Sequence, residues 1–154
     1  MFEEFTDRAR QCVHLASRKA ANLRHSEVGP EHLLFGFLKE GSGVGINVLN
    51  KMNVDLGDLK NWTEFRLAAK TKASEPLTNP PLSDSSEALL ERLQRDIAEP
   101  LGHKYVETAH LLLALLEDRV CGEILRQNGV TADVFIAELI KLRDRATLPG
   151  ADRT

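Results

Sequence analysis

The side chains of this sequence that could carry chemistry are its histidines, its two cysteines and scattered carboxylates. Imidazoles act as general bases or metal ligands, and thiolates as nucleophiles, when partner groups stand at suitable spacings. The histidines form no HExxH motif, and Cys12 and Cys121 form no CxxC motif. We therefore expect no metal site and no cofactor. The cysteines are interpreted as small buried thiols in a reducing compartment.

A glycine-rich segment at residues 41–45, Gly-Ser-Gly-Val-Gly, looks like a phosphate-binding loop. It lacks the Gly-Lys-Ser/Thr that completes such a loop, so it is interpreted as a helix connector. The chain also lacks a G-x-S-x-G nucleophile motif. With neither an ATPase motif nor a nucleophile motif, the sequence favours a non-catalytic binding domain over an enzyme.

Four of the histidines belong to a duplicated pattern. The segment His25-x-x-Val28-x-x-Glu31-His32-Leu33-Leu34 returns, 78 positions later, as His103-x-x-Val106-x-x-Ala109-His110-Leu111-Leu112. Leu49 and Val54 have counterparts in Leu125 and Val130, at an offset of 76. Two copies indicate a pseudo-twofold domain, because an open solenoid needs at least about three repeats. We expect His32 and His110 to be buried and hydrogen-bonded to the backbone.

Apolar side chains recur at helical spacing throughout the first copy. The predicted helices begin at Thr6 as N-cap, at Pro30, after the glycines of residues 41–45, and after Asp55. In the last of these, Trp62 and either Phe65 or Arg66 are expected to face inward.

The second copy predicts four matching helices. They begin near residue 83, at Thr108 as N-cap, around Ile124 and around Val134, and Pro100 should kink or end the first of them. Asn53 and Gly129 occupy equivalent positions, where a helix can end in the left-handed conformation that both residue types tolerate.

The copies are joined by residues 71–82, a proline-rich stretch that predicts a linker. The predicted fold is all-α, with about eight helices in two pseudo-twofold repeats of four, packed as one domain over residues 1–148. Repeat one covers about 1–70 and repeat two about 83–146, and residues 149–154 form a polar tail. Because half-domains of about 70 residues bury too little apolar surface alone, we expect one cooperative unit.

The net charge of −3 and the lack of a long basic run argue against a nucleic-acid footprint. No apolar stretch is long enough to span a bilayer, and the start of the chain has no signal-peptide pattern. The expected location is the cytoplasm, with no membrane partner. Nothing suggests a coiled-coil seam.

The motifs Phe5-Thr-Asp-Arg-Ala9, His25-x-x-Val28-Gly29-x-Glu31-His32 and His103-x-Tyr105-Val106 resemble the Clp amino-terminal repeat domain of Clp AAA+ unfoldases, closest to the ClpC type. The resemblance covers about residues 1–145. It implies an all-α pseudo-symmetric fold that docks substrates or adaptor proteins for an ATP-driven unfoldase and is monomeric in isolation. The chain would act either as the N-terminal domain of a Clp ATPase ring or as a free-standing regulator.

The ClpC resemblance also implies recognition of phosphorylated arginine where each repeat reads Gly-Thr-Glu-His. Copy one reads Gly29-Pro30-Glu31-His32, which keeps the carboxylate but loses the hydroxyl and one N–H. Copy two reads Glu107-Thr108-Ala109-His110, which lacks the carboxylate. These departures argue against phosphoarginine binding, most strongly in copy two. The candidate protein-binding or ligand-binding residues are Phe2, Val28, Gly29, Glu31, Val106 and Thr108.

Other interpretations of these residues stay open. Glu31 could simply complement the dipole of its helix, a contribution of about 0.3–1 kcal/mol. A DNA-associated helical regulator would need a basic recognition helix, for which the candidate is residues 141–145, interrupted by Asp144. A hydrolase would need catalysis that depends on Glu31.

Overall fold

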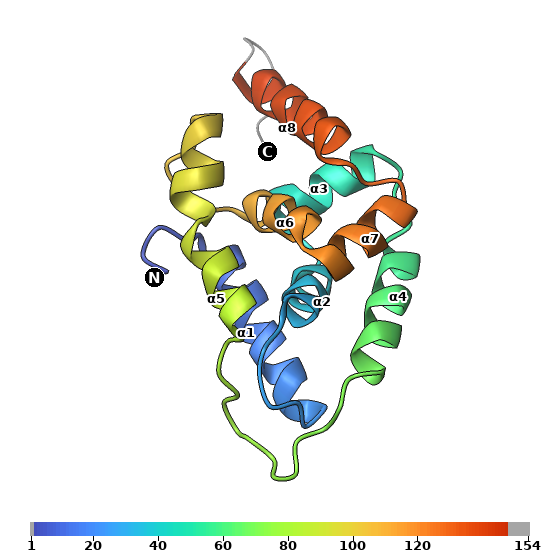
Figure 1. The fold of residues 1–154 in the computed structure, drawn as a ribbon. Helices are drawn as coiled ribbons and strands as arrows, with labels where there is room; N and C mark the ends of the chain where they lie inside the picture. The colour runs from blue at the N-terminus through green and yellow to red at the C-terminus, as the bar shows by residue number, and fades with distance from the viewer. Residues whose placement is uncertain (1, 148–154) are drawn as a thin grey trace.

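The computed structural model describes residues 2–147, with side chains described as far as residue 143, and this part of the chain is all-α as predicted (Figure 1). The first copy forms α1 (Asp7–Asn22), α2 (Pro30–Glu40), α3 (Gly43–Lys51) and α4 (Leu56–Ala68). The second copy forms α5 (Asp84–Glu91), a π-helical turn η1 (Leu93–Ala98), a 3-10 turn η2 (Glu99–Leu101), α6 (Thr108–Glu117), α7 (Arg119–Gln127) and α8 (Ala132–Thr147). The expected polar tail lies outside the described residues.

The two Leu-rich helices α2 and α6 form the centre of the molecule, and the other helices lie around them (Figure 1). Every residue of α2 from Pro30 to Phe37 is buried, as is every residue of α6 from Thr108 to Leu116. The helices contact each other, and one apolar cluster includes side chains from both copies. The described residues therefore share a single core.

Each copy also pairs with the other through a short parallel β-bridge. Phe5 pairs with Val106, where Thr6 N–H donates to Val106 O at 2.9 Å and Val106 N–H donates to Glu4 O at 2.7 Å. Val28 pairs with Leu82, and Ser83 N–H donates to Val28 O at 2.9 Å. The start of each copy thus lies against the segment before the central helix of the other copy.

The helix starts confirm one predicted cap and correct another. Thr6 is the N-cap of α1, and its hydroxyl accepts the Ala9 N–H at 3.3 Å. The prediction that Thr108 caps its own helix was wrong: Glu107 is the N-cap of α6, and Thr108 is the first helical residue. The Thr108 hydroxyl instead accepts the Gly45 N–H of α3 at 2.9 Å. It serves the start of α3, whose own N-cap residue makes no side-chain cap bond.

The glycine-rich connector is shorter than predicted. Gly41, with φ of 70°, ends α2, but Gly43 and Gly45 already belong to α3. A Cβ on Gly45 would lie 2.5 Å from the Phe37 ring, so this position requires glycine because the two helices approach so closely. At the other end of α3, Asn53 has φ of 58° and its counterpart Gly129 has φ of 84°, which confirms the predicted left-handed helix ends.

The inward face of α4 differs from the prediction. Trp62 and Phe65 are 50% and 64% exposed, and Arg66 pairs with Glu123 of α7 instead of entering the core. The buried residues are Leu59, Thr63 and Leu67, a stripe with spacing of four. Thr63 can occupy this stripe because its hydroxyl donates to Leu59 O of the preceding turn at 2.7 Å.

Pro100 explains the irregular segment after α5. Proline has no N–H to donate to the carbonyl four residues earlier, and its ring would clash with that carbonyl in an α-helix. Here the chain widens into the π-helical turn η1, in which Glu99 N–H donates to Gln94 O, five residues back. The segment then tightens into η2 and ends at Gly102 with φ of 78°. The predicted interruption at Pro100 is confirmed.

Within residues 2–147, no helix combines the length and the apolar character that crossing a membrane requires.

Candidate functional site

A pair of histidines braces the start of the central helix in each copy. His32 Nδ1 accepts the Gly29 N–H at 2.9 Å, and His32 Nε2 lies 2.7 Å from His25 Nδ1. A neutral His32 whose Nδ1 accepts must carry its proton on Nε2, so Nε2 donates to His25. The second copy repeats the arrangement, with Glu107 N–H to His110 Nδ1 at 2.8 Å and His110 Nε2 to His103 Nδ1 at 2.7 Å.

Burial keeps these central imidazoles neutral. His32 and His110 are 1% and 0% exposed. Burial, followed by the positive charge that His25 would carry, lowers the pKa of His32 to about 3. Burial and His103 lower the pKa of His110 to about 4. The prediction that His32 and His110 are buried and bonded to the backbone is confirmed.

Glu31 lies in the first turn of α2 and is 8% exposed. Its Oε2 lies 3.2 Å from Lys70 Nζ, but no hydrogen bond of good geometry reaches that oxygen. The carboxylate therefore has an internal counter-ion from the end of α4. The equivalent residue of copy two, Ala109, is fully buried and carries no charge.

The other predicted site residues form two groups. Val28 and Gly29 lie with Glu31 at the start of α2, and Val28 is 1% exposed beside Leu82. Val106 and Thr108 lie at the start of α6 and are 0% and 2% exposed.

Phe2 adjoins the second group through Phe5, which pairs with Val106. Its ring meets the Phe5 ring edge-on at 5.1 Å between centroids. The Phe2 carbonyl accepts from Arg10 Nε at 3.2 Å. Among the six candidates, Phe2 is partly exposed, whereas Val28, Glu31, Val106 and Thr108 are buried.

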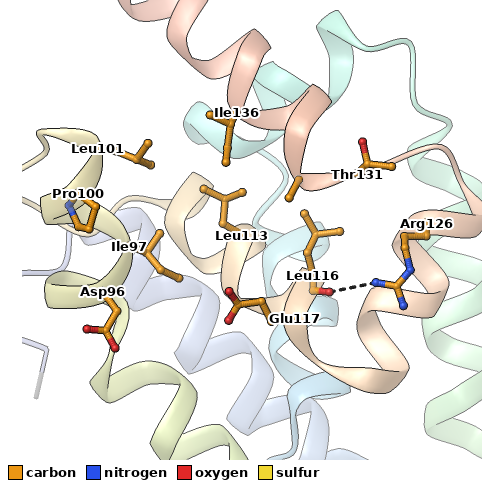
Figure 2. A pocket seen from close by; sticks show the side chains of 11 residues that line it. Asp96, Ile97, Pro100, Leu101, Leu113, Leu116, Glu117, Arg126, Thr131 and Ile136 are labelled. Atoms are coloured by element: carbon orange, nitrogen blue, oxygen red, sulfur yellow. Dashed lines mark hydrogen bonds between the residues drawn. The ribbon is translucent and has the colours of Figure 1, made fainter.

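The sequence prediction missed an apolar groove in the second copy (Figure 2). It has a volume of about 480 Å³ and lies among η1, η2, α6, α7 and α8. Figure 2 shows Ile136 of α8 pointing toward Leu113 of α6, with Pro100 and Leu101 along one side. The complete lining is Asp96, Ile97, Pro100, Leu101, Leu113, Leu116, Glu117, Arg126, Thr131, Ala132 and Ile136. We call it the α6–α8 groove.

The charged side chains at the rim of the α6–α8 groove already have partners. Asp96 and Glu117 both form ion pairs with Arg92. Arg126 donates to Leu116 O at 3.3 Å, the bond drawn in Figure 2. The floor consists of aliphatic side chains, so the groove suits apolar side chains better than a charged ligand.

Two side chains fix the shape of the groove. Arg143 of α8 donates to Leu101 O at 2.7 Å, which ties α8 to the end of η2. Pro100 causes the π-helical widening that sets η1 apart from an ordinary helix. Pro100 was the one signal in the sequence that could have pointed to this place. Within the described residues, no group of three or more His, Cys, Asp or Glu could hold a metal ion.

The comparisons with known proteins agree with this fold. The model of the family described as "Clp repeat (R) N-terminal domain" matches residues 4–141. A probable ATP-dependent Clp protease ATP-binding subunit of Chlamydia pneumoniae is 34% identical over 92% of the chain. The chain spans 17% of the length of that relative. Other relatives include ClpC proteins of a bacterium and of chloroplasts.

Solved structures show the same fold. The N-terminal domain of Hsp104 from Candida albicans has a TM-score of 0.77 at 24% identity, with 98% of this chain and 95% of that chain covered. A complex of the ClpV N-domain with a VipB peptide has a TM-score of 0.59 at 18% identity, with 99% of this chain and 81% of that chain covered.

Proposed function

The chain belongs to the Clp repeat N-terminal domain family, and on that premise we propose that it is a protein-binding module. It docks substrates or adaptor proteins for a Clp-type ATP-dependent unfoldase, by binding and without chemistry of its own. It does so either as the N-terminal domain of the ATPase or as a free-standing regulator. The α6–α8 groove is the observation that carries this proposal, because it is apolar and open to solvent.

The groove suits a short amphipathic segment of a partner. Its floor offers Ile97, Leu113 and Leu116, which are 6–9% exposed, and the rim carries paired charges. A partner helix can place apolar anchors on such a floor while its polar face stays in water. The solved complex of a ClpV N-domain with a peptide supports peptide docking on this fold.

The proposal treats residues 1–148 as one domain, with repeats at about 1–70 and 83–146 joined by residues 71–82. The two β-bridges, Phe5 with Val106 and Val28 with Leu82, support this unit. Each joins the start of one repeat to the segment before the central helix of the other. In isolation the domain is proposed to be a monomer.

Phosphoarginine is not the proposed ligand. Lys70 already lies against the Glu31 carboxylate, and Pro30 removes an N–H from the start of α2. In copy two the equivalent of Glu31 is Ala109, and the Thr108 hydroxyl is engaged by Gly45. We therefore assign a structural role, and not a ligand-binding role, to the residues at the starts of α2 and α6.

The other functions gain no support from the geometry. For a DNA-associated regulator, two of the cations are already engaged: Lys141 pairs with Glu138 at 3.4 Å, and Arg143 binds the Leu101 carbonyl. A hydrolase would need catalysis that depends on Glu31, but this carboxylate is buried beside Lys70. Asp144 and Arg145 lie outside the described side chains.

The test is a pull-down from native lysate, read by mass spectrometry, with the whole chain as bait. Ile136→Glu places a charge in the α6–α8 groove, and Val134→Glu places one on the same helix at a residue that is 48% exposed and does not line the groove. We expect the wild type and Val134→Glu to recover a Clp ATPase, its adaptors or its clients, and Ile136→Glu to lose them. Thermal melting checks that both variants fold. A wild-type bait that recovers no Clp component would refute the proposal.

A further inference from the structure

A second hollow lies between α1 and α2. Both helices lie away from α8 in Figure 1. It has a volume of about 330 Å³ and is lined by Leu15, Arg18, Lys19 and Asn22 of α1 with Phe35 and Lys39 of α2. The α1 residues follow the spacing of one helix face, and the two α2 residues lie one turn apart. The hollow is therefore the open side of the α1–α2 hairpin, and we call it the α1–α2 notch.

The α1–α2 notch is positively charged. Three cations line it and no carboxylate does, although the chain as a whole carries a net charge of −3. A neighbouring hollow shares Arg18 and Asn22 and is lined by His14, Ser17, Ala21, Thr78 and Asn79, again without a carboxylate. Arg18 therefore borders both hollows, and neither of them is lined by a carboxylate.

Two of the three cations are available to a partner. Lys19 is held in place, because its Nζ lies 3.3 Å from Glu64 Oε1 and 4.3 Å from the centroid of the Phe35 ring. Arg18 and Lys39 form no ion pair with the described residues. They flank an apolar surface made by Leu15 and Phe35. The notch thus combines two free positive charges with a small apolar floor.

We propose that the α1–α2 notch binds an acidic segment of a partner protein. A guanidinium such as that of Arg18 can hold a carboxylate by two parallel hydrogen bonds, and Lys39 supplies a second positive charge. An apolar side chain next to the acidic residues would rest on Leu15 and Phe35. This inference rests on the proposed protein-binding function and adds a surface separate from the α6–α8 groove.

The geometry favours an acidic protein segment over a nucleic acid. A nucleic-acid backbone needs many cations along a continuous track, since affinity grows with the number of phosphates neutralised. The notch offers three cations within one concave site, one of them engaged by Glu64. A site of that size matches two or three carboxylates on a peptide.

The experiment measures the fluorescence anisotropy of a labelled peptide, Glu-Asp-Leu-Glu-Asp-Phe-Glu-Asp, titrated with the whole chain at low salt. We expect Arg18→Glu/Lys39→Glu to weaken binding roughly tenfold or more, because it reverses both free charges. The matched control Lys51→Glu/Lys104→Glu makes the same change in net charge at exposed lysines outside the notch and should stay within about twofold. If the double reversal fails to fold, Arg18→Gln/Lys39→Gln replaces it.

Salt and a competitor complete the test. Wild-type affinity should fall as salt rises, since surface charges are screened within about 10 Å at 0.1 M. Equal weakening in the notch and control variants overturns the inference, as does tighter binding of a single-stranded oligonucleotide than of the peptide. Ile136→Glu should keep peptide binding. If the wild-type chain binds the peptide but recovers no Clp component from lysate, only the proposed function is refuted. If it recovers Clp components but does not bind the peptide, only this inference is refuted.

Discussion

The buried histidine pairs predict that acid destabilises the fold by a calculable amount. In the unfolded chain each histidine titrates near its ordinary pKa of about 6.5. In the folded chain the pKa is about 3 for His32 and about 4 for His110. Between these values the unfolded chain binds protons that the folded chain rejects. Stability is therefore greatest above pH 6.5 and falls as the pH decreases below it.

The size of the effect follows from the two pKa values. Between pH 7 and pH 5, linkage lowers the free energy of unfolding by about 2 kcal/mol through each of His32 and His110. Together they amount to about 4 kcal/mol, a large share of the roughly 5–15 kcal/mol that stabilises a typical domain. The main cause is the burial of both rings, followed by the neighbouring histidine of each pair. In addition, a second proton on either ring would have to sit on Nδ1, against the backbone N–H that Nδ1 accepts.

Urea unfolding followed by circular dichroism at pH 7, 6 and 5 measures this dependence. In His110→Gln the loss between pH 7 and pH 5 should shrink by about half, even if the variant is less stable at every pH. A wild-type loss that persists unchanged in His32→Gln/His110→Gln would show that the pairs are not the titrating groups.

Three further predictions concern the interlocked repeats and their helix starts. Thr108→Val leaves the Gly45 N–H buried without an acceptor and should cost about 1–3 kcal/mol in urea unfolding, whereas Thr108→Ser, which keeps the hydroxyl, should cost less. Calorimetry of the whole chain should show one transition, because both copies share one core, and separate melting of residues 1–72 and 80–154 would contradict this. Titration calorimetry with free phosphoarginine should give no saturable heat, since Lys70 already neutralises Glu31, and binding that disappears in Glu31→Ala would reverse that conclusion.

The fold could be predicted from the sequence because its strongest signals are local and occur twice. Each copy places a Leu-rich run directly after a histidine, and both runs became the central helices. The helix ends at Asn53 and Gly129 depend only on residue type and position. Such features need no knowledge of what lies across the core.

Two of the wrong or missed predictions concern residues whose partners lie far away in the sequence. Local capping rules assigned the Thr108 hydroxyl to its own helix, but its partner is Gly45, a residue of the other copy. The error at Trp62 has a local cause instead: Thr63 takes the buried position of α4, because its hydroxyl donates to Leu59 O of the same helix. The α6–α8 groove escaped prediction because it joins five elements, and only Pro100 marks it in the sequence.

The two β-bridges between the repeats also affect how the protein folds during its synthesis. A ribosome releases the first repeat before the second, yet Val28 pairs with Leu82, and α2 packs on α6. Between the addition of Glu40, at the end of α2, and Glu117, at the end of α6, about four to fifteen seconds pass at roughly 5–20 residues per second. During that interval the apolar faces of α2 lack their final cover. The first repeat is therefore incompletely folded until the second repeat has been synthesised.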